Sequence, residues 1–428
     1  MVVKPWFPLA VAVLTLLLVG AGLSAQSQRR DAFVAPRDHP AIRYSTAETT
    51  DAATALNRRL RAGTVALKFE PGHGYLRSLL DALAVPAESQ ALVFSQTSFQ
   101  APHVNYRNPR AVYFTDTVAV GWVRGGEVLE FVGQDPTQGS VFYTMSQTSD
   151  KPVLERNDAC VSCHASEATH YVPGMFIGSV FPGVDGTTMY GPAYTTDHRS
   201  PFEIRWGGWF VTGTHRATRH LGNAVASDPA NLIAMVSPST VHVTDLEGRF
   251  DKTGYLSLHS DLVGLLVIEH QAKMLNLFTR VGWEARIGEK ESGRTIDQAA
   301  AELVDYLLFV DEATLPGPIA GTTRFAEIFQ AQGPRDSRGR SLRDLSLDTR
   351  LLRYPCSYLI YSEPFDSLPP KAKTAIYGRM WEILSGQERD KRYAVLTVAD
   401  RRAILEILSE TKPDAAAYFA QRTTPDTY

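Results

Sequence analysis

The segment Asn157-Asp158-Ala159-Cys160-Val161-Ser162-Cys163-His164 places two cysteines three residues apart, with a histidine directly after the second. Asn157 and Asp158 can cap a short helix that begins near Ala159. One turn of such a helix brings both sulfurs and the imidazole to one side of the chain. The segment therefore predicts a site that holds a large, flat group through three neighbouring side chains.

Cys-x-x-Cys-His is the pattern of covalent haem attachment, in which two thiols bond to the macrocycle and the histidine binds the iron. Three alternatives compete with it. A zinc ribbon would need a second cysteine pair, and only Cys356 remains in the sequence. A thioredoxin-like site needs no histidine after the motif, and a plain disulfide leaves His164 unexplained. The motif thus favours one covalent haem c, held by Cys160 and Cys163 with His164 on the iron.

Residues 158 to 164 resemble the attachment site of the c-type cytochromes. Two longer segments are similar to large, poorly characterised bacterial single-haem proteins that are exported: Arg205-Trp206-Gly207-Gly208-Trp209-Phe210-Val211-Thr212-Gly213-Thr214-His215 and Tyr354-Pro355-Cys356-Ser357-Tyr358-Leu359-Ile360-Tyr361. The resemblance implies a single haem and no particular reaction. At 428 residues the chain is much longer than a small cytochrome c, so the compact helical fold of those proteins is not expected for all of it.

The N-terminal residues 1–25 predict a secretory signal peptide, with Lys4, an apolar run over 9–23 and the small pair Ser24-Ala25. Cleavage after Ala25 is expected, and an uncleaved membrane anchor is the alternative. The predicted location is therefore periplasmic or otherwise exported, with a membrane partner only if the signal is uncleaved. A net charge of −3 lacks the basic footprint of nucleic-acid binding, so no nucleic-acid partner is expected.

The remaining chain predicts an α+β fold in three modules, since 44% hydrophobic residues can fill a sizeable core. A linker over 26–49 leads into an N-terminal α+β module over 50–155. Residues 156–230 are rich in glycine, proline and aromatic side chains, which predicts an irregular haem-binding segment that is ordered by the haem. Residues 231–428 predict a mainly helical C-terminal module.

Hydrophobic periodicity places the elements within these modules. A helical stretch is expected over 50–83, broken at Pro71-Gly72-His73-Gly74. A small antiparallel sheet is expected from strands over 91–99, 111–123, 128–132 and 141–145. The C-terminal helices are expected over 262–286, 295–312, 370–384 and 398–409, with Thr295-x-x-Gln298 as a capping box.

The sixth position on the iron is the main open question at the site. Met175 lies eleven residues after His164, behind Pro173-Gly174, where the chain can turn back over the haem. Met175 is therefore the predicted sixth ligand, and ordinary apolar packing is the alternative. Other candidates are Met189, His170, His198, His215 and His259.

A second group of residues is expected around the porphyrin. Arg205, Trp206, Trp209 and His215 can bury its face and pair its propionates, and a packed hairpin with solvated arginines is the alternative. Glu269 and His270 suggest a second metal site, although a satisfied interior histidine is favoured, because a lone His with one Glu completes no common ligand set. Cys356 reads as a buried thiol.

The expected function is one-electron transfer through haem c to or from an exported redox partner protein or a small-molecule electron donor or acceptor. The alternative is a haem c enzyme, peroxidase-like or oxidoreductase-like, with an open or displaceable sixth iron site. A haem-based sensor is a third interpretation. The sequence contains no separate signalling motif to support it.

Overall fold

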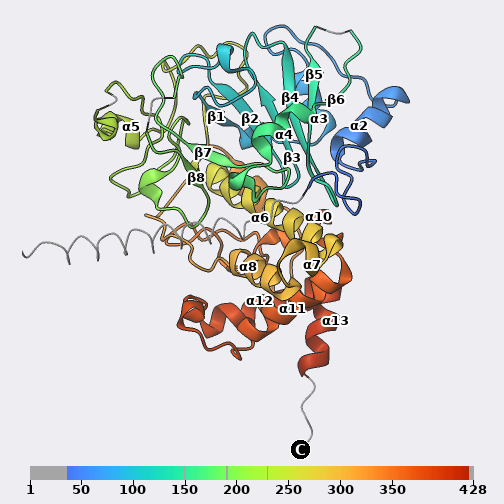
Figure 1. Cartoon of the computed structure of the whole chain (residues 1–428). Helices are drawn as coiled ribbons and strands as arrows, with labels where there is room; N and C mark the ends of the chain where they lie inside the picture. Colours follow the sequence, from blue (N-terminus) through green and yellow to red (C-terminus); the bar gives the residue numbers. More distant parts are fainter. Residues whose placement is uncertain (1–35, 149, 189–190, 229, 424–428) are drawn as a thin grey trace, which may run out of the picture.

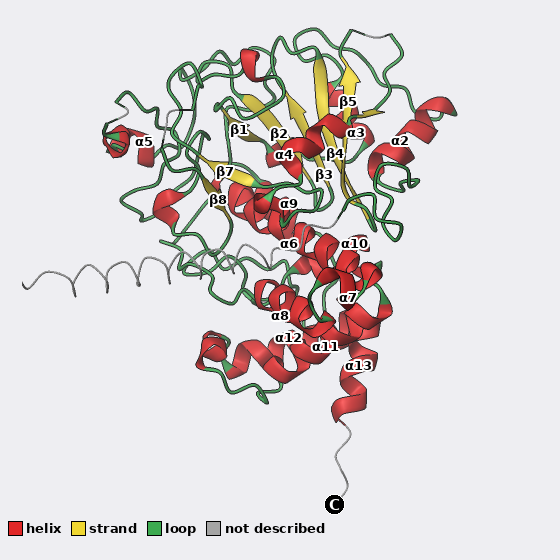
Figure 2. Cartoon of the chain, viewed as in Figure 1, coloured by secondary structure: helices red, strands yellow, loops and turns green. Residues whose placement is uncertain are grey.

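The structure is a computed structural model that describes residues 36–148, 150–188, 191–228 and 230–423. The predicted signal peptide and the first part of the predicted linker lie outside these residues. The predicted α+β class is confirmed, with strands gathered in one half of the molecule and most helices in the other (Figures 1 and 2). Within the described residues, no helix combines the length and the apolar stretch that a bilayer crossing requires.

The N-terminal half is built on a six-stranded antiparallel sheet in which each strand pairs with the next along the chain. Its strands are β1 Ala91–Val93, β2 Arg110–Phe114, β3 Val118–Trp122, β4 Val128–Asp135, β5 Gly139–Ser146 and β6 Glu155–Arg156. The predicted sheet is confirmed, but the strand expected over 91–99 ends at Val93 and one further strand needs correction. The stretch expected as one strand over 111–123 is a hairpin, because the polar Thr115-Asp116-Thr117 turns the chain between β2 and β3.

Alternation along the strands gives the sheet two apolar faces. One face carries Tyr113, Val120 and Phe131, which pack against the helices α2 Ala52–Arg61 and α3 Leu76–Ala82. The opposite face carries Phe114 and Ala119, which pack in the same core as α6 Leu262–Ile287. The helical stretch expected over 50–83 is therefore two separate helices, with a longer break than predicted.

α6 is the central helix of the molecule, and Figure 1 shows it passing beneath the sheet into the helical half. Its residues are buried nearly all round, because the sheet and the other helices enclose it. The other helices that follow the sheet in the chain are α5 Pro238–Val241, which Figure 1 shows at the edge of the sheet half, and α7 Glu289–Ser292, α8 Ile296–Leu307, α9 Phe325–Gln330, α10 Glu363–Asp366, α11 Pro370–Leu384, α12 Val398–Thr411 and α13 Pro413–Thr423. The predicted helices correspond to α6, α8, α11 and α12, and the capping box at Thr295 and Gln298 is formed.

The described residues of segment 156–230 form short elements, among them α4 Val161–His164, the hairpin of β7 Ile177–Ser179 with β8 Tyr194–Thr196, and 3₁₀ turns. Its remaining backbone bonds go to neighbouring parts of the fold. Phe94 donates from its backbone nitrogen to Gly208 and Phe210 donates to Leu92, so the segment extends the sheet beside β1. One apolar core then runs from β1 to α13, so the boundary predicted at residue 230 does not separate two cores.

Candidate haem site

The motif lies on a single helical turn anchored to the sheet. The Asn157 backbone nitrogen donates to Phe142 on β5, and its side chain accepts from the Ala159 nitrogen at 3.2 Å. Arg156 pairs with Asp158 at 2.8 Å. The predicted cap is therefore formed, and it starts a 3₁₀ turn over Asp158–Cys160 that continues into α4. These bonds place α4 over the sheet face that α6 also covers (Figure 1).

The two cysteines of the motif are free thiols with different environments. Cys160 is half-buried, whereas Cys163 is exposed. Burial raises the pKa of the Cys160 thiol, and the nearby Glu130 carboxylate raises it further. Neither thiol is oriented by a disulfide in this structure, so both are available for another bond. Cys356 lies fully buried in the helical half, where burial raises the pKa of its thiol far above the usual range.

His164 is oriented by a reciprocal pair of hydrogen bonds with Gly174. Its Nδ1 donates to the Gly174 carbonyl at 2.9 Å, and the Gly174 nitrogen donates to the His164 carbonyl at 2.9 Å. The ring lies between Phe142 and Phe176, with centroid distances of 4.8 and 5.5 Å. Because Nδ1 carries the proton, the lone pair is on Nε2, and no described residue bonds to that atom. Burial lowers the pKa of His164, so the ring is neutral near pH 7.

An ion pair on the sheet lies close to the motif and was not predicted from the sequence. Arg110 on β2 binds Glu130 on β4 at 2.8 Å, with both side chains mostly buried. Glu130 also accepts from Gln100 at 3.2 Å, while Nε of Arg110 is buried without a partner. Phe142 packs on His164 and pairs with Val132 of β4. Glu130 lies two residues before Val132 on the same strand, so its side chain is on the same face of the sheet. Only the strand pairing brings these charges to the motif.

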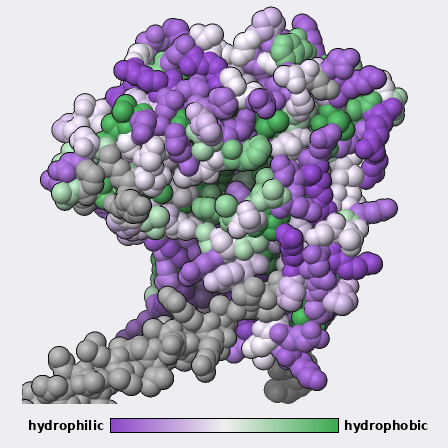
Figure 3. All heavy atoms as spheres, turned by 45° about the horizontal axis from the view of Figure 1, so that its top comes forward, coloured by the Kyte–Doolittle hydropathy of each residue, from purple (hydrophilic) through white to green (hydrophobic). Residues whose placement is uncertain are grey.

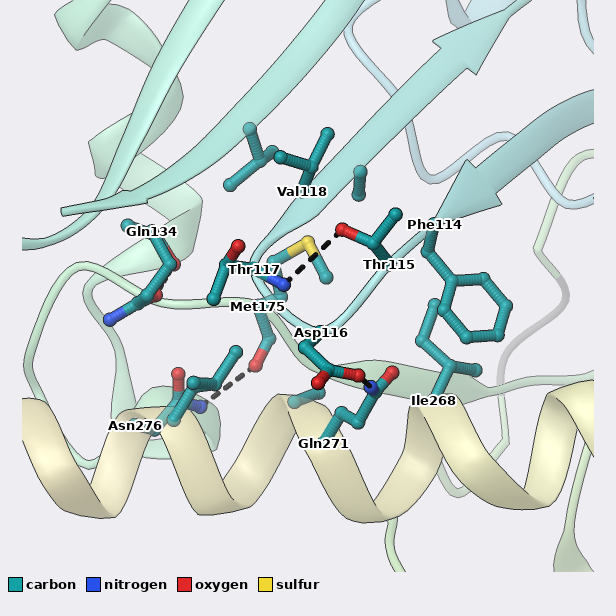
Figure 4. Close-up of a pocket in the computed structure, with 15 residues that line it drawn as sticks. Phe114, Thr115, Asp116, Thr117, Val118, Gln134, Met175, Ile268, Gln271 and Asn276 are labelled. Atoms are coloured by element: carbon teal, nitrogen blue, oxygen red, sulfur yellow. Dashed lines mark hydrogen bonds between the residues drawn. The ribbon is translucent and has the colours of Figure 1, made fainter. Parts of the chain in front are cut away.

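The main chain around Met175 lies on the Nδ1 side of His164. His164 would hold the iron through Nε2, on the side of the imidazole away from the Gly174 carbonyl. Figure 4 shows the thioether of Met175 turned toward Thr115, Thr117 and Val118, in a small cavity of about 20 Å³ between the β2–β3 turn and α6. Met175 as sixth ligand therefore stays a prediction that this geometry does not favour.

The residues predicted to surround the porphyrin make contacts with other parts of the protein interior: Arg205, Trp206, Trp209 and His215. Arg205 is fully buried and binds Glu269 of α6 at 3.0 Å. Trp206 is fully buried, and Nε1 of Trp209 donates to the Gly178 carbonyl at 2.7 Å. His215 forms a bond of 3.1 Å between Nε2 and the Val241 carbonyl. The arginine expected to pair a propionate thus has a carboxylate partner in the core.

The remaining predicted ligand candidates lie in separate places. His198 and His270 share a bond of 2.9 Å between their Nδ1 atoms, and Nε2 of His270 is 2.7 Å from the Ser357 hydroxyl. Nε2 of His198 is buried without a partner, and an unpaired buried N–H would cost free energy, so we place the proton of this ring on Nδ1. Nδ1 of His198 then donates to Nδ1 of His270, and Nε2 of His270 donates to the Ser357 hydroxyl. Glu269 and His270 are therefore both satisfied in the interior. His259 lies in the chain before α6, and Met189 is outside the described residues.

A larger cavity of about 520 Å³ opens beside the motif, between the loop that follows α4, the β7–β8 hairpin and α6. Its lining includes His170, Met175 and Phe176 from the chain after the motif, together with Glu269 and Lys273 from α6. Figure 3 shows the surface hollowed near the middle of the molecule, with both polar and apolar side chains around the hollow. Phe176 separates this cavity from the His164 ring, because it contacts both.

The described residues contain no cluster of three or more His, Cys, Asp or Glu side chains that could hold a metal ion. A haem needs no such cluster, because the macrocycle supplies four nitrogen ligands and the protein adds axial ones. Comparisons with family models, with curated proteins and with solved structures found no match. The function is therefore inferred from the residues of this chain.

Proposed function

We propose that this protein is an exported single-haem c-type cytochrome that carries out one-electron transfer. Cys160 and Cys163 would hold the haem covalently, and His164 would bind the iron. The observation that carries the proposal is the bond from Nδ1 of His164 to the Gly174 carbonyl, which leaves Nε2 unprotonated and free. Metal-binding histidines are commonly oriented in this way by a carbonyl on the second nitrogen.

The surroundings of the motif fit a large apolar group with charged edges. Phe142 and Phe176 flank the imidazole and fix its plane. Arg110 has a buried Nε without a partner and can pair with a propionate, while Glu130 keeps the local charge balanced. Exposure of Cys163 supports electron transfer, because a thioether at the surface brings the edge of the macrocycle within reach of a redox partner.

Covalent attachment can be tested by expressing the full chain with cytochrome c maturation machinery and extracting the purified protein with acidic acetone. We expect one haem per chain that stays with the protein, and Cys160→Ala with Cys163→Ala to release or lack it. Cys356→Ala is the matched control, since that thiol is buried in the core that includes the C-terminal helices. Wild-type protein that binds zinc and shows no haem absorption would contradict the proposal.

The assignment of His164 has its own test. His164→Ala should change the iron spectrum more than any other histidine substitution, because the residue after the second cysteine is tethered beneath the iron. His73→Ala is a suitable control, since His73 pairs with Glu70 near the start of α3. An unchanged ligand spectrum in the His164 variant would show that the proximal ligand is elsewhere.

A second candidate function is a haem c enzyme, peroxidase-like or oxidoreductase-like, with an open or displaceable sixth position. Two observations favour keeping it: Met175 lies on the proximal side of the ring, and a cavity of about 520 Å³ opens next to the site. The two functions differ in the resting spectrum. A low-spin haem that does not bind carbon monoxide supports electron transfer, whereas a high-spin haem with rapid carbon monoxide binding supports the enzyme.

A further inference from the structure

A short segment before α6 packs on a small apolar cluster of its own. Residues 232–241, called the strap below, include a 3₁₀ turn over Leu232–Met235 and the helix α5, which Figure 1 shows at the edge of the sheet half. Met235 of the strap packs with Phe181 in a cluster of five buried residues that is separate from the two large cores. Because few apolar residues hold the strap, its opening costs less free energy than the unfolding of either large core.

The end of the strap is held by two histidines that share one acceptor. Nε2 of His215 lies 3.1 Å from the Val241 carbonyl oxygen, and Nε2 of His220 lies 3.0 Å from the same oxygen, so both nitrogens donate. Nδ1 of His220 accepts from the Gly222 nitrogen at 3.0 Å. Nδ1 of His215 is buried without a partner, and an unpaired buried N–H there would cost free energy. Both rings are therefore neutral while the strap is closed.

A third histidine lies against this pair. The ring centroid of His215 is 5.2 Å from that of His220 and 5.2 Å from that of His242, the residue directly after the strap. His215 and His220 are buried, and His242 is exposed. Since the rings lie in contact, a proton that charges one of them opposes the charging of the next.

The surroundings of the rings offer little negative charge. Charged side chains lie on each segment around them: Glu203 and Arg205 before the pair, Arg216 and Arg219 between its members, and Asp245 after the strap. Arg205 is paired within the core, whereas Glu203 and Asp245 are exposed and bond to none of the three rings. Through charge, only the other histidines act on the pKa of the two buried rings, and each of them lowers it.

The closed strap therefore resists protonation of its histidines. Burial lowers the pKa of His220 to about 3, and burial also lowers the pKa of His215. Release of Val241 would give both rings access to water, where a histidine titrates near its ordinary pKa of about 6.5. The open state then binds protons more tightly than the closed state, so the closed strap loses stability as the pH falls below about 6.5.

We propose that His215, His220 and His242 form an acid-sensitive latch, which holds the strap closed at neutral pH and releases it at acidic pH. Release breaks both bonds to Val241 and uncovers the apolar cluster around Phe181. Clusters of histidines are a common basis for conformational switches that respond near pH 5 to 6. This inference goes beyond the proposed function and does not depend on it.

Hydrogen exchange followed by mass spectrometry tests the latch on the purified full-length protein at pH 7 and pH 5, with rates corrected for the intrinsic effect of pH. We expect the protection of peptides within 232–241 to fall at least tenfold, because one histidine whose pKa differs as His220 does accounts for roughly 25-fold. Peptides from α11 should stay protected at both pH values. Equal protection of the strap at pH 7 and pH 5, or an equal loss in α11, would overturn the proposal.

A double variant, His215→Gln with His220→Gln, removes both titrating groups. Each glutamine keeps an amide that can donate to the Val241 carbonyl, so protection of the strap at pH 5 should stay within about twofold of that at pH 7. His73→Gln is the matched control, since His73 pairs with Glu70 near the start of α3, and it should show the full wild-type fall. A double variant that also shows the full wild-type fall contradicts the latch.

If the glutamines do not reach Val241, the strap of the double variant opens at both pH values, and His242→Gln then decides. The His242 ring forms no hydrogen bond with a described residue, so this variant keeps both bonds to Val241 and removes one of the three charges. The latch requires a smaller fall in strap protection between pH 7 and pH 5 than in the wild type. An unchanged fall in this variant overturns the proposal.

Discussion

At the scale of single residues, the sequence locates the proposed attachment residues but not the groups that surround them. Cys160, Cys163 and His164 are adjacent in the chain, so their spacing alone predicts their joint role. The Gly174 carbonyl that orients His164, and the Arg110–Glu130 pair beside it, come close only through folding. No local pattern marks a carbonyl or an ion pair between two strands as part of a site.

Met175 is the residue for which the sequence and the geometry give different expectations. Its placement on the Nδ1 side of His164 predicts that Met175→Ala leaves the axial-ligand spectrum unchanged. The variant should still lose about 1–3 kcal/mol of stability, because the side chain packs against the core. Visible spectra of the oxidised and reduced protein check the first expectation. A low-spin wild type that becomes high-spin and binds carbon monoxide in the variant would establish Met175 as the ligand.

Glu130 is predicted to influence the reduction potential of the proposed haem. Its negative charge favours ferric iron, and Glu130→Gln leaves the positive charge of Arg110 unbalanced. The midpoint potential should rise by on the order of tens of millivolts. Redox titration measures it, and Glu382→Gln on α11 is a control with the same change of charge far from the site. A fall in potential, or an equal rise in both variants, contradicts the assignment.

The buried carboxyl group of Glu312 is expected to make the free energy of unfolding depend on pH. Burial raises the pKa of Glu312 from 4.5 to about 7, while the Leu351 nitrogen and nearby arginines oppose the shift. The folded state therefore holds the proton more tightly than the unfolded state, so this stabilisation is complete below pH 4.5 and is lost as the pH rises through 7. Glu312→Gln should remove on the order of 1–3 kcal/mol of this pH dependence. Urea unfolding at pH 5 and pH 8 measures the difference.

At the scale of elements, long periodic stretches are predicted well and segments held by tertiary contacts are not. α6 and α11 follow their hydrophobic patterns, and the apolar run over 111–123 hides a tight turn because its polar residues are few. For the segment that contains Arg205, the contacts predicted from the sequence differ most from those in the structure. Its aromatic and basic residues suggested a haem wall, whereas Arg205 pairs with Glu269, 64 residues away in the sequence.

The start of α6 is predicted to be an important point of stability. Oδ1 of Asp261 accepts from the Val263 nitrogen at 2.8 Å, and Oδ2 accepts from the Thr322 and Thr323 nitrogens at 2.9 and 2.8 Å. One buried carboxylate thus caps the helix and ties it to the chain before α9. Asp261→Ala should lower the free energy of unfolding by about 2–4 kcal/mol.

Chemical unfolding measures this loss, and Asp390→Ala provides the matched control. Asp390 also caps a helical turn, but it is exposed and accepts from the Arg392 nitrogen alone. Its substitution should cost about 1 kcal/mol or less. Equal losses in the two variants would show that the link to Thr322 and Thr323 contributes little.

At the scale of the whole molecule, the sheet half and the helical half share one core. The same apolar cluster contains Val93 of β1 and Phe419 of α13, with α6 between them. Asp116 in the β2–β3 turn binds both Gln271 of α6 and Arg343 in the helical half. The sequence suggested three modules because its composition changes along the chain. It could not show that residues from all three enter one core.

This shared core predicts a single unfolding transition for the holoprotein. Far-UV circular dichroism reports mainly on the helices, and haem absorption would report on the motif at the sheet. Since α6 packs against both, the two signals should give the same midpoint. Ile376→Ala, which truncates a fully buried side chain of α11, should lower the free energy of unfolding by about 2–4 kcal/mol and should lower both midpoints together. Val398→Ala is the control, because Val398 is 73% exposed, and it should leave both midpoints in place. If Ile376→Ala shifted the midpoint of the helical signal alone, the helical half would unfold independently, and the packing of α11 would not contribute to the stability of the proposed haem site.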